Sequence, residues 1–229
     1  MKLTMEVDDV FYHLAPVLQA PGSRRIIEIG AHDGKHSDLI RTLCRERPHY
    51  LAIEPDQRNI KTMLQSGLQV VNFAVSDRDG EADWYESRGT TPGTQNRCHT
   101  DSSSLKRPTK HLEVHPWCEF EKASYQVMTM TLDSVMSHIG WYYWCEDPPQ
   151  EIDLIWADVQ GAQLEVIRGG EKCLSMTRYL FIEVHPEPYY AGEPSFRNLH
   201  SDLEKVSGCD WEIVEHYPAD VLLKRVGSS

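Results

Sequence analysis

The sequence RIIEIGAHDG, residues 25–34, places a short apolar run directly before two glycines that stand four positions apart. The run predicts a buried strand over Arg25–Ile29. Gly30 allows a sharp turn of the backbone, and Gly34 opens a helix whose first amides favour negatively charged groups. A strand, a glycine turn and a helix in this order indicate the first unit of a parallel α/β sheet.

The same alternation continues outward from this unit, which predicts an α/β fold. Further strands are expected at 50–54, 70–74, 152–158 and 179–183, and helices at 10–18, 34–44, 60–64, 163–168 and 196–206. The stretches 211–215 and 221–224 flank Tyr217-Pro218 and predict an antiparallel hairpin. We therefore expect one domain over residues 1–229, which begins with a helix at about 5–20. Residues 79–124 are polar and interrupt the alternation, so we interpret them as a long lid-like insertion with one strand at 82–86.

The composition indicates which binding partners and which cellular compartment to expect. The formal net charge is −12, which argues against nucleic-acid binding because Lys and Arg side chains must displace phosphate counterions. No apolar run is long enough to span a bilayer, and the polar, acidic start does not resemble a secretion signal. Six scattered cysteines without a C-x-x-C pair favour reduced thiols over disulfides or zinc. We expect a cytoplasmic protein without a membrane partner.

Carboxylates near the ends of the predicted strands indicate a ligand site. Glu28 lies two residues before the glycine turn, Glu54 ends the second strand, and Asp158 ends the strand at 152–158. The carboxyl ends of parallel strands share one edge, where such folds bind ligands. A connecting turn, a solvated acid at Glu54 and a helix cap at Asp158 are the alternatives.

The loop GAHDG, residues 30–34, lacks the middle glycine of a G-x-G-x-x-G dinucleotide fingerprint, which argues against NAD. An acidic group near this turn suits the ammonium and sulfonium of S-adenosylmethionine (SAM) better than a diphosphate. Glu54 is placed to accept hydrogen bonds from both ribose hydroxyls of an adenosine. The residues therefore favour SAM as the cofactor.

A second acidic group follows the strand at 179–183. Glu183 and His185 alternate, so they point to the same side. With Asp158 on a neighbouring strand end they predict either a base cluster or a site for a divalent metal. The alternative is a buried, hydrogen-bonded acid beside a loop histidine.

Seven segments, in order over roughly residues 25–190, resemble the FkbM-type methyltransferases of the class I SAM-dependent fold. They are IIEIGAHDGKHS (26–37), LAIEPD (51–56), NFAVSDRDGEADWY (72–85), SSSLKRPTKHLEVHP (102–116), MTLDSV (130–135), IDLIWADVQGAQLEVIRGG (152–170) and YLFIEVHPEPYY (179–190). The resemblance implies a class I SAM-methyltransferase fold, with a seven-stranded, mostly parallel sheet in the order 3-2-1-4-5-7-6. It also implies helices on both faces of the sheet and an antiparallel seventh strand.

The resemblance further implies where SAM binds. Glu28 and Gly30 would line its methionine end, Glu54 its ribose and residues 74–76 its adenine, while Asp158 would lie beside the methyl donor. The full candidate cofactor set is Glu28, Gly30, Ala31, His32, Gly34, Ser37, Glu54, Pro55, Ala74, Val75, Ser76 and Asp158. The chain departs from the family pattern at His32, and at Gln160 and Gln163, where the family commonly has glutamate. The two glutamines weaken a metal site.

The function expected is therefore methyl transfer from SAM to a hydroxyl of a sugar, a glycan or a small natural product. His185 is the first candidate for the proton acceptor and Asp158 the second, with Glu183 orienting the histidine. In the polar segment at about 90–124, Ser103 and Ser104 are expected to hydrogen-bond the acceptor.

Trp117 is expected to stack on an acceptor ring.

One alternative function is a metal-assisted methyltransferase in which Asp158, Glu183 and His185 hold the ion. Another is a SAM-binding module without catalysis. The acceptor and the oligomeric state do not follow from the sequence.

Overall fold

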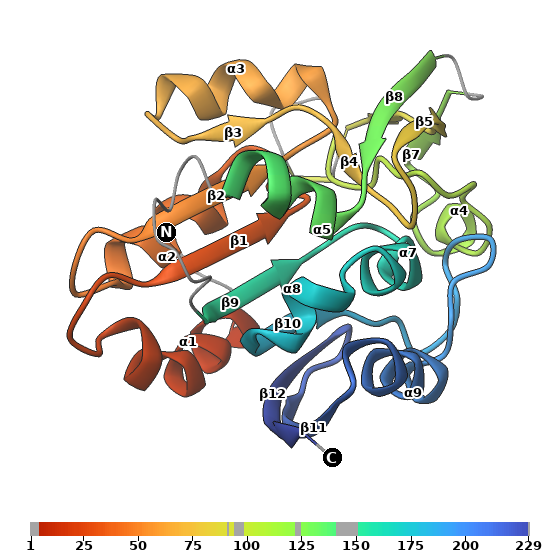
Figure 1. Ribbon diagram of the computed structural model, residues 1–229. Helices are drawn as coiled ribbons and strands as arrows, with labels where there is room; N and C mark the ends of the chain where they lie inside the picture. Colours follow the sequence, from red (N-terminus) through yellow and green to blue (C-terminus); the bar gives the residue numbers. More distant parts are fainter. Residues whose placement is uncertain (1–4, 91, 94–98, 122–124, 141–150, 229) are drawn as a thin grey trace.

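The computed structural model of the chain describes residues 5–90, 92–93, 99–121, 125–140 and 151–228. Its main sheet has seven strands in the order β3-β2-β1-β9-β10-β12-β11 (Figure 1). They are β1 (Arg25–Ile29), β2 (His49–Ile53), β3 (Val70–Val71), β9 (Ile152–Ala157), β10 (Thr177–Glu183), β11 (Cys209–His216) and β12 (Asp220–Ser228). Counted along the chain within this sheet, the order is 3-2-1-4-5-7-6, and β12 runs antiparallel to β10. The predicted sheet and the closing hairpin are both confirmed.

Helices cover both faces of this sheet, so its strands are apolar on both sides. Ile26 packs against α1 (Met5–Leu18), α2 (Lys35–Leu43) and α3 (Gln57–Gln65), which lie on one face. Ile27 packs on the other face. That face is covered by α5 (Leu132–Val135), α7 (Gln163–Arg168), α8 (Glu171–Ser175) and α9 (Phe196–Ser207). The strands are therefore fixed between two apolar layers, and this packing positions the polar side chains at their carboxyl ends.

The expected strand at 70–74 is wrong in its second half. The side-chain amide of Asn72 donates to the carbonyls of Glu54 and Pro55, at 2.8 and 2.9 Å, and the chain leaves the main sheet there. Strand β4 (Ala74–Val75) instead joins β5 (Gly80–Trp84) and β8 (Tyr125–Met130) in a second, three-stranded sheet.

The segment at 79–124 contains more regular structure than the sequence predicted. Strands β6 (Ser87–Gly89) and β7 (Cys118–Phe120) pair with each other, and α4 (His111–Val114) lies between them in the chain. Residues 91, 94–98 and 122–124 of the expected lid lie outside the described residues. The two small sheets lie beyond the carboxyl ends of β1 and β9 (Figure 1), so this insertion stands beside the edge where the sequence predicts a ligand site.

The remaining regular element is a π-helical turn, η1 (Met136–Gly140). Within the described part of the chain, every helix is too short or too polar to span a membrane.

Gly30 is the point at which the main sheet meets the predicted loop. Its φ is +79°, and a Cβ atom placed on it would lie 1.8 Å from the carbonyl oxygen of Asp158. The amide of Asp158 donates to the carbonyl of Ile29 at 2.9 Å, so the two chain segments are joined here. A side chain at position 30 therefore requires the ends of β1 and β9 to separate.

Replacing Gly30 with Ala should lower the free energy of unfolding in urea far more than replacing Gly67. Gly67 also has a positive φ, of +72°, but no atom lies within 4 Å of the position that a Cβ would take there. The Gly67→Ala control should cost about 1–2 kcal/mol, the backbone cost of a left-handed residue. Gly30→Ala carries that cost and the displacement of Asp158 as well. Equal losses in the two variants would contradict the close approach.

Candidate functional site

A cavity of about 230 Å³ lies at the carboxyl ends of β1, β2 and β9. It brings together eight of the twelve residues in the predicted cofactor set. These are Gly30, Ala31, His32, Glu54, Pro55, Ala74, Val75 and Asp158. Four separate segments of the chain supply them, which is the convergence expected at the carboxyl edge of a parallel sheet.

The structure places the other four residues outside this lining, at Glu28, Gly34, Ser37 and Ser76. The carboxylate of Glu28 accepts hydrogen bonds from the hydroxyls of Ser37 and Tyr50 behind the loop. Burial raises the pKa of Glu28 to about 7, and the two hydrogen bonds oppose that rise. Glu28 therefore supports the loop by joining α2 to β2.

Gly34 is the N-cap of α2, and its φ of +81° is left-handed. The amide of Ser76 donates to the carbonyl of Met130, and its hydroxyl lies 3.4 Å from a carboxylate oxygen of Asp77. These two residues shape the chain next to the cavity without lining it.

Glu54 is the acidic group in the middle of the cavity lining. Its side chain is buried, and its two oxygens accept hydrogen bonds from the amides of His32 (2.7 Å) and Asp56 (2.8 Å). Burial raises the pKa of Glu54 to about 7, against the lowering effect of these amides. The carboxylate is thus fixed in direction and keeps acceptor capacity for a ligand that carries hydroxyl groups.

One end of the cavity is apolar and the other is polar. Phe73, Ala74, Val75, Trp84 and Leu105 line the apolar end. Ala74 and Trp84 also belong to a small buried cluster with Leu105 packed against it. A flat apolar ring fits this end, a hydroxyl-bearing group fits Glu54, and a cationic group fits the end near Asp158.

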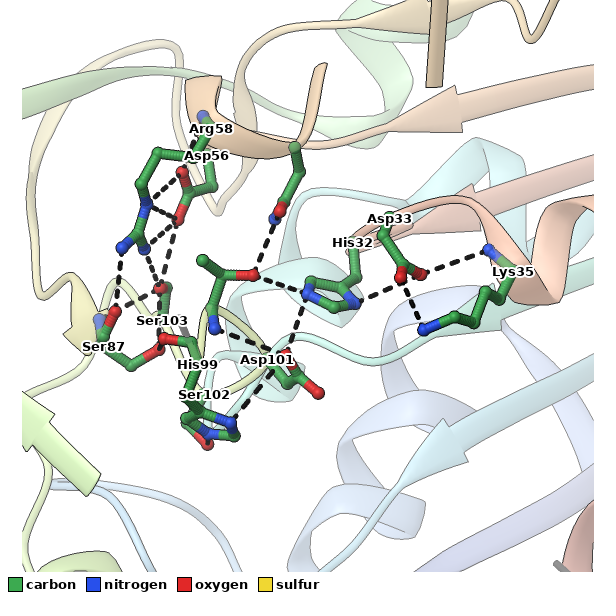
Figure 2. A network of polar contacts seen from close by, with 12 residues as sticks. His32, Asp33, Lys35, Asp56, Arg58, Ser87, His99, Asp101, Ser102 and Ser103 are labelled. Atoms are coloured by element: carbon green, nitrogen blue, oxygen red, sulfur yellow. Dashed lines mark hydrogen bonds and ion pairs between the residues drawn. The ribbon is translucent and has the colours of Figure 1, made fainter. Parts of the chain in front are cut away.

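Residues 100–105, which we call the strap, lie between β6 and α4 in the chain and pass along the cavity. Thr100, Asp101, Ser103 and Leu105 of the strap line the cavity. Figure 2 shows the His32 ring between the strap and the glycine loop. Its Nε2 lies 2.6 Å from the Thr100 hydroxyl and 2.9 Å from an Asp101 oxygen, while Nδ1 lies 3.4 Å from Asp33.

This ion pair favours a charged His32. Burial lowers the pKa of His32, but hydrogen bonds to Asp101 and Asp33 outweigh burial and raise it to about 9. The same histidine, with a φ of +49°, uses its backbone amide to hold Glu54. His32 therefore connects the strap to the acidic group of the cavity.

The second anchor of the strap is Ser103. Its hydroxyl contacts Asp56 at 3.2 Å, and the amide of Ser87 donates to it at 3.0 Å (Figure 2). Arg58 binds both oxygens of Asp56 and also reaches Ser103 at 3.2 Å. Ser104 donates to the carbonyl of Gln160 at 2.5 Å.

The serines that the sequence assigned to the acceptor are thus engaged with protein atoms. Trp117, the predicted stacking residue, packs edge-on against His99 and His115 at centroid distances of 4.7 and 5.6 Å and does not line the cavity. These contacts support a structural role for all three residues.

Asp158, Glu183 and His185 are linked, but not as the predicted metal site. The side-chain amide of Gln160 donates to Asp158 at 2.6 Å and to Glu183 at 2.9 Å, so an N–H group stands between the two carboxylates. Among the residues that the structure describes, no three His, Cys, Asp or Glu side chains are arranged to hold a metal ion. The donor set proposed from the sequence is therefore not assembled.

His185 is held between two carboxylates. Its Nδ1 lies 2.7 Å from Glu193 and its Nε2 lies 3.3 Å from Glu183. Burial lowers the pKa of His185, but the two carboxylates outweigh burial and raise it to about 10. An imidazole that is already protonated at neutral pH cannot accept a proton from a substrate, which argues against the predicted role.

The sequence patterns did not indicate several of the residues that line the cavity. His36 lies in the first turn of α2, Trp84 ends β5, and Thr100 and Asp101 belong to the strap. The helical register from Gly34 could have found His36. No periodic pattern marked the strap.

Comparisons with known proteins identify the family of the chain. The family model described as the methyltransferase FkbM domain matches residues 28–207. A relative named 2-O-methyltransferase NoeI, from Sinorhizobium fredii, is 31% identical over 210 residues, which cover 87% of this chain and 78% of that protein.

Two solved structures are also similar. Methyltransferase FkbM from Methylobacillus flagellatus KT superposes with a TM-score of 0.52 and 13% identity. That match covers 89% of this chain, but this chain spans only 44% of that protein. Magnesium protoporphyrin IX methyltransferase from Synechocystis PCC 6803, solved with bound SAM, gives a TM-score of 0.46 and 13% identity, covering 97% of this chain and 78% of that one. The family match and the 31% identical relative establish that the chain belongs to the FkbM family of SAM-dependent methyltransferases.

Proposed function

We propose that this methyltransferase transfers the methyl group of SAM to a hydroxyl oxygen of a sugar or glycan. The observation that carries the proposal is the similarity to a 2-O-methyltransferase over 87% of the chain. The net charge of −12 further favours a neutral acceptor over a polyanionic one. A small natural product with a hydroxyl group is the other acceptor of the same chemistry.

The cofactor site we propose is the 230 Å³ cavity. Its lining follows the strand order of the sheet, from apolar residues after β3, through Glu54 after β2, to Gly30 after β1 and Asp158 after β9. The adenine would pack at the apolar end formed by Phe73, Val75 and Leu105. The ribose hydroxyls would donate to Glu54. The methionine end, which carries the ammonium and sulfonium charges, would lie at Gly30 and Asp158.

The chemistry that SAM supplies is a methyl group on a positively charged sulfur, which is already a good leaving group. The protein therefore has three tasks: to hold the reactants in line, to keep water out, and to accept the proton of the hydroxyl. The metal-assisted alternative has no support from Asp158, Glu183 and His185, because Gln160 bridges the two acids. Cytoplasmic action stays a prediction, consistent with the free thiols of Cys44, Cys118, Cys173 and Cys209.

The test is to incubate the protein with methyl-labelled SAM and panels of neutral glycosides, oligosaccharides, small natural products, proteins and RNA. We expect label in an alkali-stable ether of a sugar hydroxyl. Label only in protein or RNA would overturn the acceptor class.

The cofactor site has its own test in Glu54→Gln. This change should weaken SAM binding, measured by calorimetry, at least about tenfold, because a charge-assisted hydrogen bond contributes roughly 1.5–3 kcal/mol. The matched control is Glu81→Gln, at an exposed position of β5. Equal affinities for the two variants would contradict the placement of the ribose.

Opening the strap should loosen the cofactor. Asp101→Asn removes the ion pair with His32 and should weaken SAM binding about two- to fivefold at pH 7.5, the range of a partly exposed pair. Asp210→Asn, at an exposed position of β11, is the control.

The ion pair between Asp101 and His32 also predicts the direction in which SAM affinity changes with pH. The pKa of His32 is raised from 6.5 to about 9, so its stabilising contribution is complete below about 6.5 and is lost as the pH rises through 9. SAM affinity of the parent chain should therefore fall between pH 8 and 10, and that of Asp101→Asn should fall less. Parallel curves would show that the strap does not respond to this pair.

A further inference from the structure

A second cavity, of about 100 Å³, adjoins the cofactor cavity on the side of α1. Its lining residues are Val10, His36, Trp156, Asp158, Phe181, Tyr217 and Asp220. Two of them, His36 and Asp158, also line the cofactor cavity. These two residues therefore form the wall that the cavities share. Because the main sheet runs in the order β3-β2-β1-β9, this wall at the end of β9 lies opposite to Phe73 and Val75, which follow β3.

We propose that the second cavity receives the ring that carries the acceptor hydroxyl, and that His36 accepts the proton of this hydroxyl. The inference rests on the proposed function, because it assumes that SAM lies with its methionine end at Asp158. With the adenine at the apolar end and the ribose at Glu54, the adenosine would lie away from the shared wall. An acceptor that approaches the methyl group from the far side of the sulfur must then come through the second cavity.

The position of His36 suits this role. It lies in the first turn of α2, and its ring centroid lies 5.3 Å from that of Trp156, which fixes the ring at the wall. The charged groups that act on it are Asp158 at the end of β9 and, on its own loop and helix, His32, Asp33 and Lys35.

Burial lowers the pKa of His36 and outweighs the opposing effect of Asp158. His36 is therefore neutral at pH 7 and has a nitrogen lone pair to offer. His185 is the contrasting case, since its two carboxylates keep it protonated. Three histidines lie near Asp158, and of these His32 and His185 have a raised pKa, so the one that lines both cavities, His36, is also the one in the correct protonation state.

The proposed step balances as follows. A lone pair of the acceptor oxygen forms the new C–O bond to the methyl carbon, and the electron pair of the C–S bond goes to sulfur. The sulfonium becomes a neutral thioether, S-adenosylhomocysteine (SAH). The hydroxyl proton moves to the neutral imidazole of His36, which releases it to solvent after the product leaves.

The walls of the second cavity indicate the class of acceptor. Trp156 and Phe181 are buried aromatic residues whose rings lie 4.0 Å apart, and Val10 covers them from α1. Phe11 also stacks on Trp156, with ring centroids 5.9 Å apart, so these rings form an apolar wall rather than an open stacking face. Such a wall fits the C–H groups of a sugar ring. Asp158 and Asp220 bring negative charge, which repels phosphorylated or carboxylated acceptors. The structure therefore favours a neutral sugar over a sugar phosphate or a uronic acid.

The first experiment needs no acceptor. The pKa of His36 is measured by NMR in the free protein and in its SAM and SAH complexes, with His36→Gln used to assign the signal. SAM and SAH differ by one positive charge at the sulfur, so SAM should lower the pKa of His36 by about 0.5–2 units relative to SAH. The same pKa in both complexes would overturn the placement of His36 beside the methyl donor. Failure to bind either ligand, or binding that Glu54→Gln leaves unchanged, would instead count against the proposed cofactor site.

The second experiment uses the neutral glycoside that accepts label, or methyl glucoside where no natural acceptor is known. His36→Gln should lower kcat/KM for methyl transfer about 100-fold or more while the Kd for SAM stays within twofold. The parent chain should lose activity as the pH falls through the pKa of His36, and this acidic limb should flatten in the variant. The control is His216→Gln, at an exposed position of β11, which should leave both constants unchanged.

A blocking variant tests the cavity itself. Val10→Phe places a larger side chain in the second cavity and should lower kcat/KM for the acceptor at least tenfold. SAM affinity should be retained, and this retention also shows that the variant is folded. A His36→Gln variant that loses SAM affinity and turnover together would show that His36 holds the cofactor, and would overturn the proposal. Unchanged turnover in Val10→Phe, or preference for a uronic acid over the neutral glycoside, would overturn it too.

Discussion

The contact between the backbone at Gly30 and the carbonyl of Asp158 is the constraint on which the site depends. Because position 30 has no Cβ, the ends of β1 and β9 come together, and the amide of Asp158 pairs with Ile29. This approach brings the glycine loop and an acidic strand end into one cavity. It also makes His36, in the turn that follows, a neighbour of that acid.

Burial of acidic groups is the second constraint. Glu28, Glu54, Asp158 and Glu183 all have a raised pKa, with burial as the largest cause. Three donor sets hold them: two hydroxyls for Glu28, two backbone amides for Glu54, and the Gln160 amide, which Asp158 and Glu183 share. Unpaired, such groups would lose several kcal/mol of solvation. The polar network is therefore part of the fold as much as part of the site.

The sequence predicted the features that depend on apolar patterns and on strand ends. The main sheet followed from buried runs such as Arg25–Ile29, and Glu54 and Asp158 followed from the rule that ligands bind at the carboxyl edge. Glu28 lies outside the cavity lining because residues alternate along a strand: Ile27 and Ile29 face one layer, and Glu28 faces the layer that contains α2.

The elements that the sequence missed are short and exposed on one side. The strand expected at 82–86 overlaps β5 but starts two residues late, and β8 was not expected because only Val127 and Thr129 among its six residues are buried. The regular structure of the strap is limited to a turn and a single bridge between Ser104 and Tyr85. Its position follows from contacts made across the chain, such as Thr100 with His32 and Ser103 with Asp56. The protonation state of His185 depends on its contact with Glu193, eight residues away, and no motif indicated this contact.

The wall of His36 and Asp158 also has a consequence for the order of events. The strap and the glycine loop line the cofactor cavity, whereas Val10 of α1 and Tyr217 and Asp220 of the closing hairpin line the second cavity. Apart from the wall, the two cavities have no lining residue in common. If the acceptor binds in the second cavity as proposed, either reactant could enter or leave while the other stays bound, and the kinetic scheme that this arrangement predicts is a random-order ternary complex.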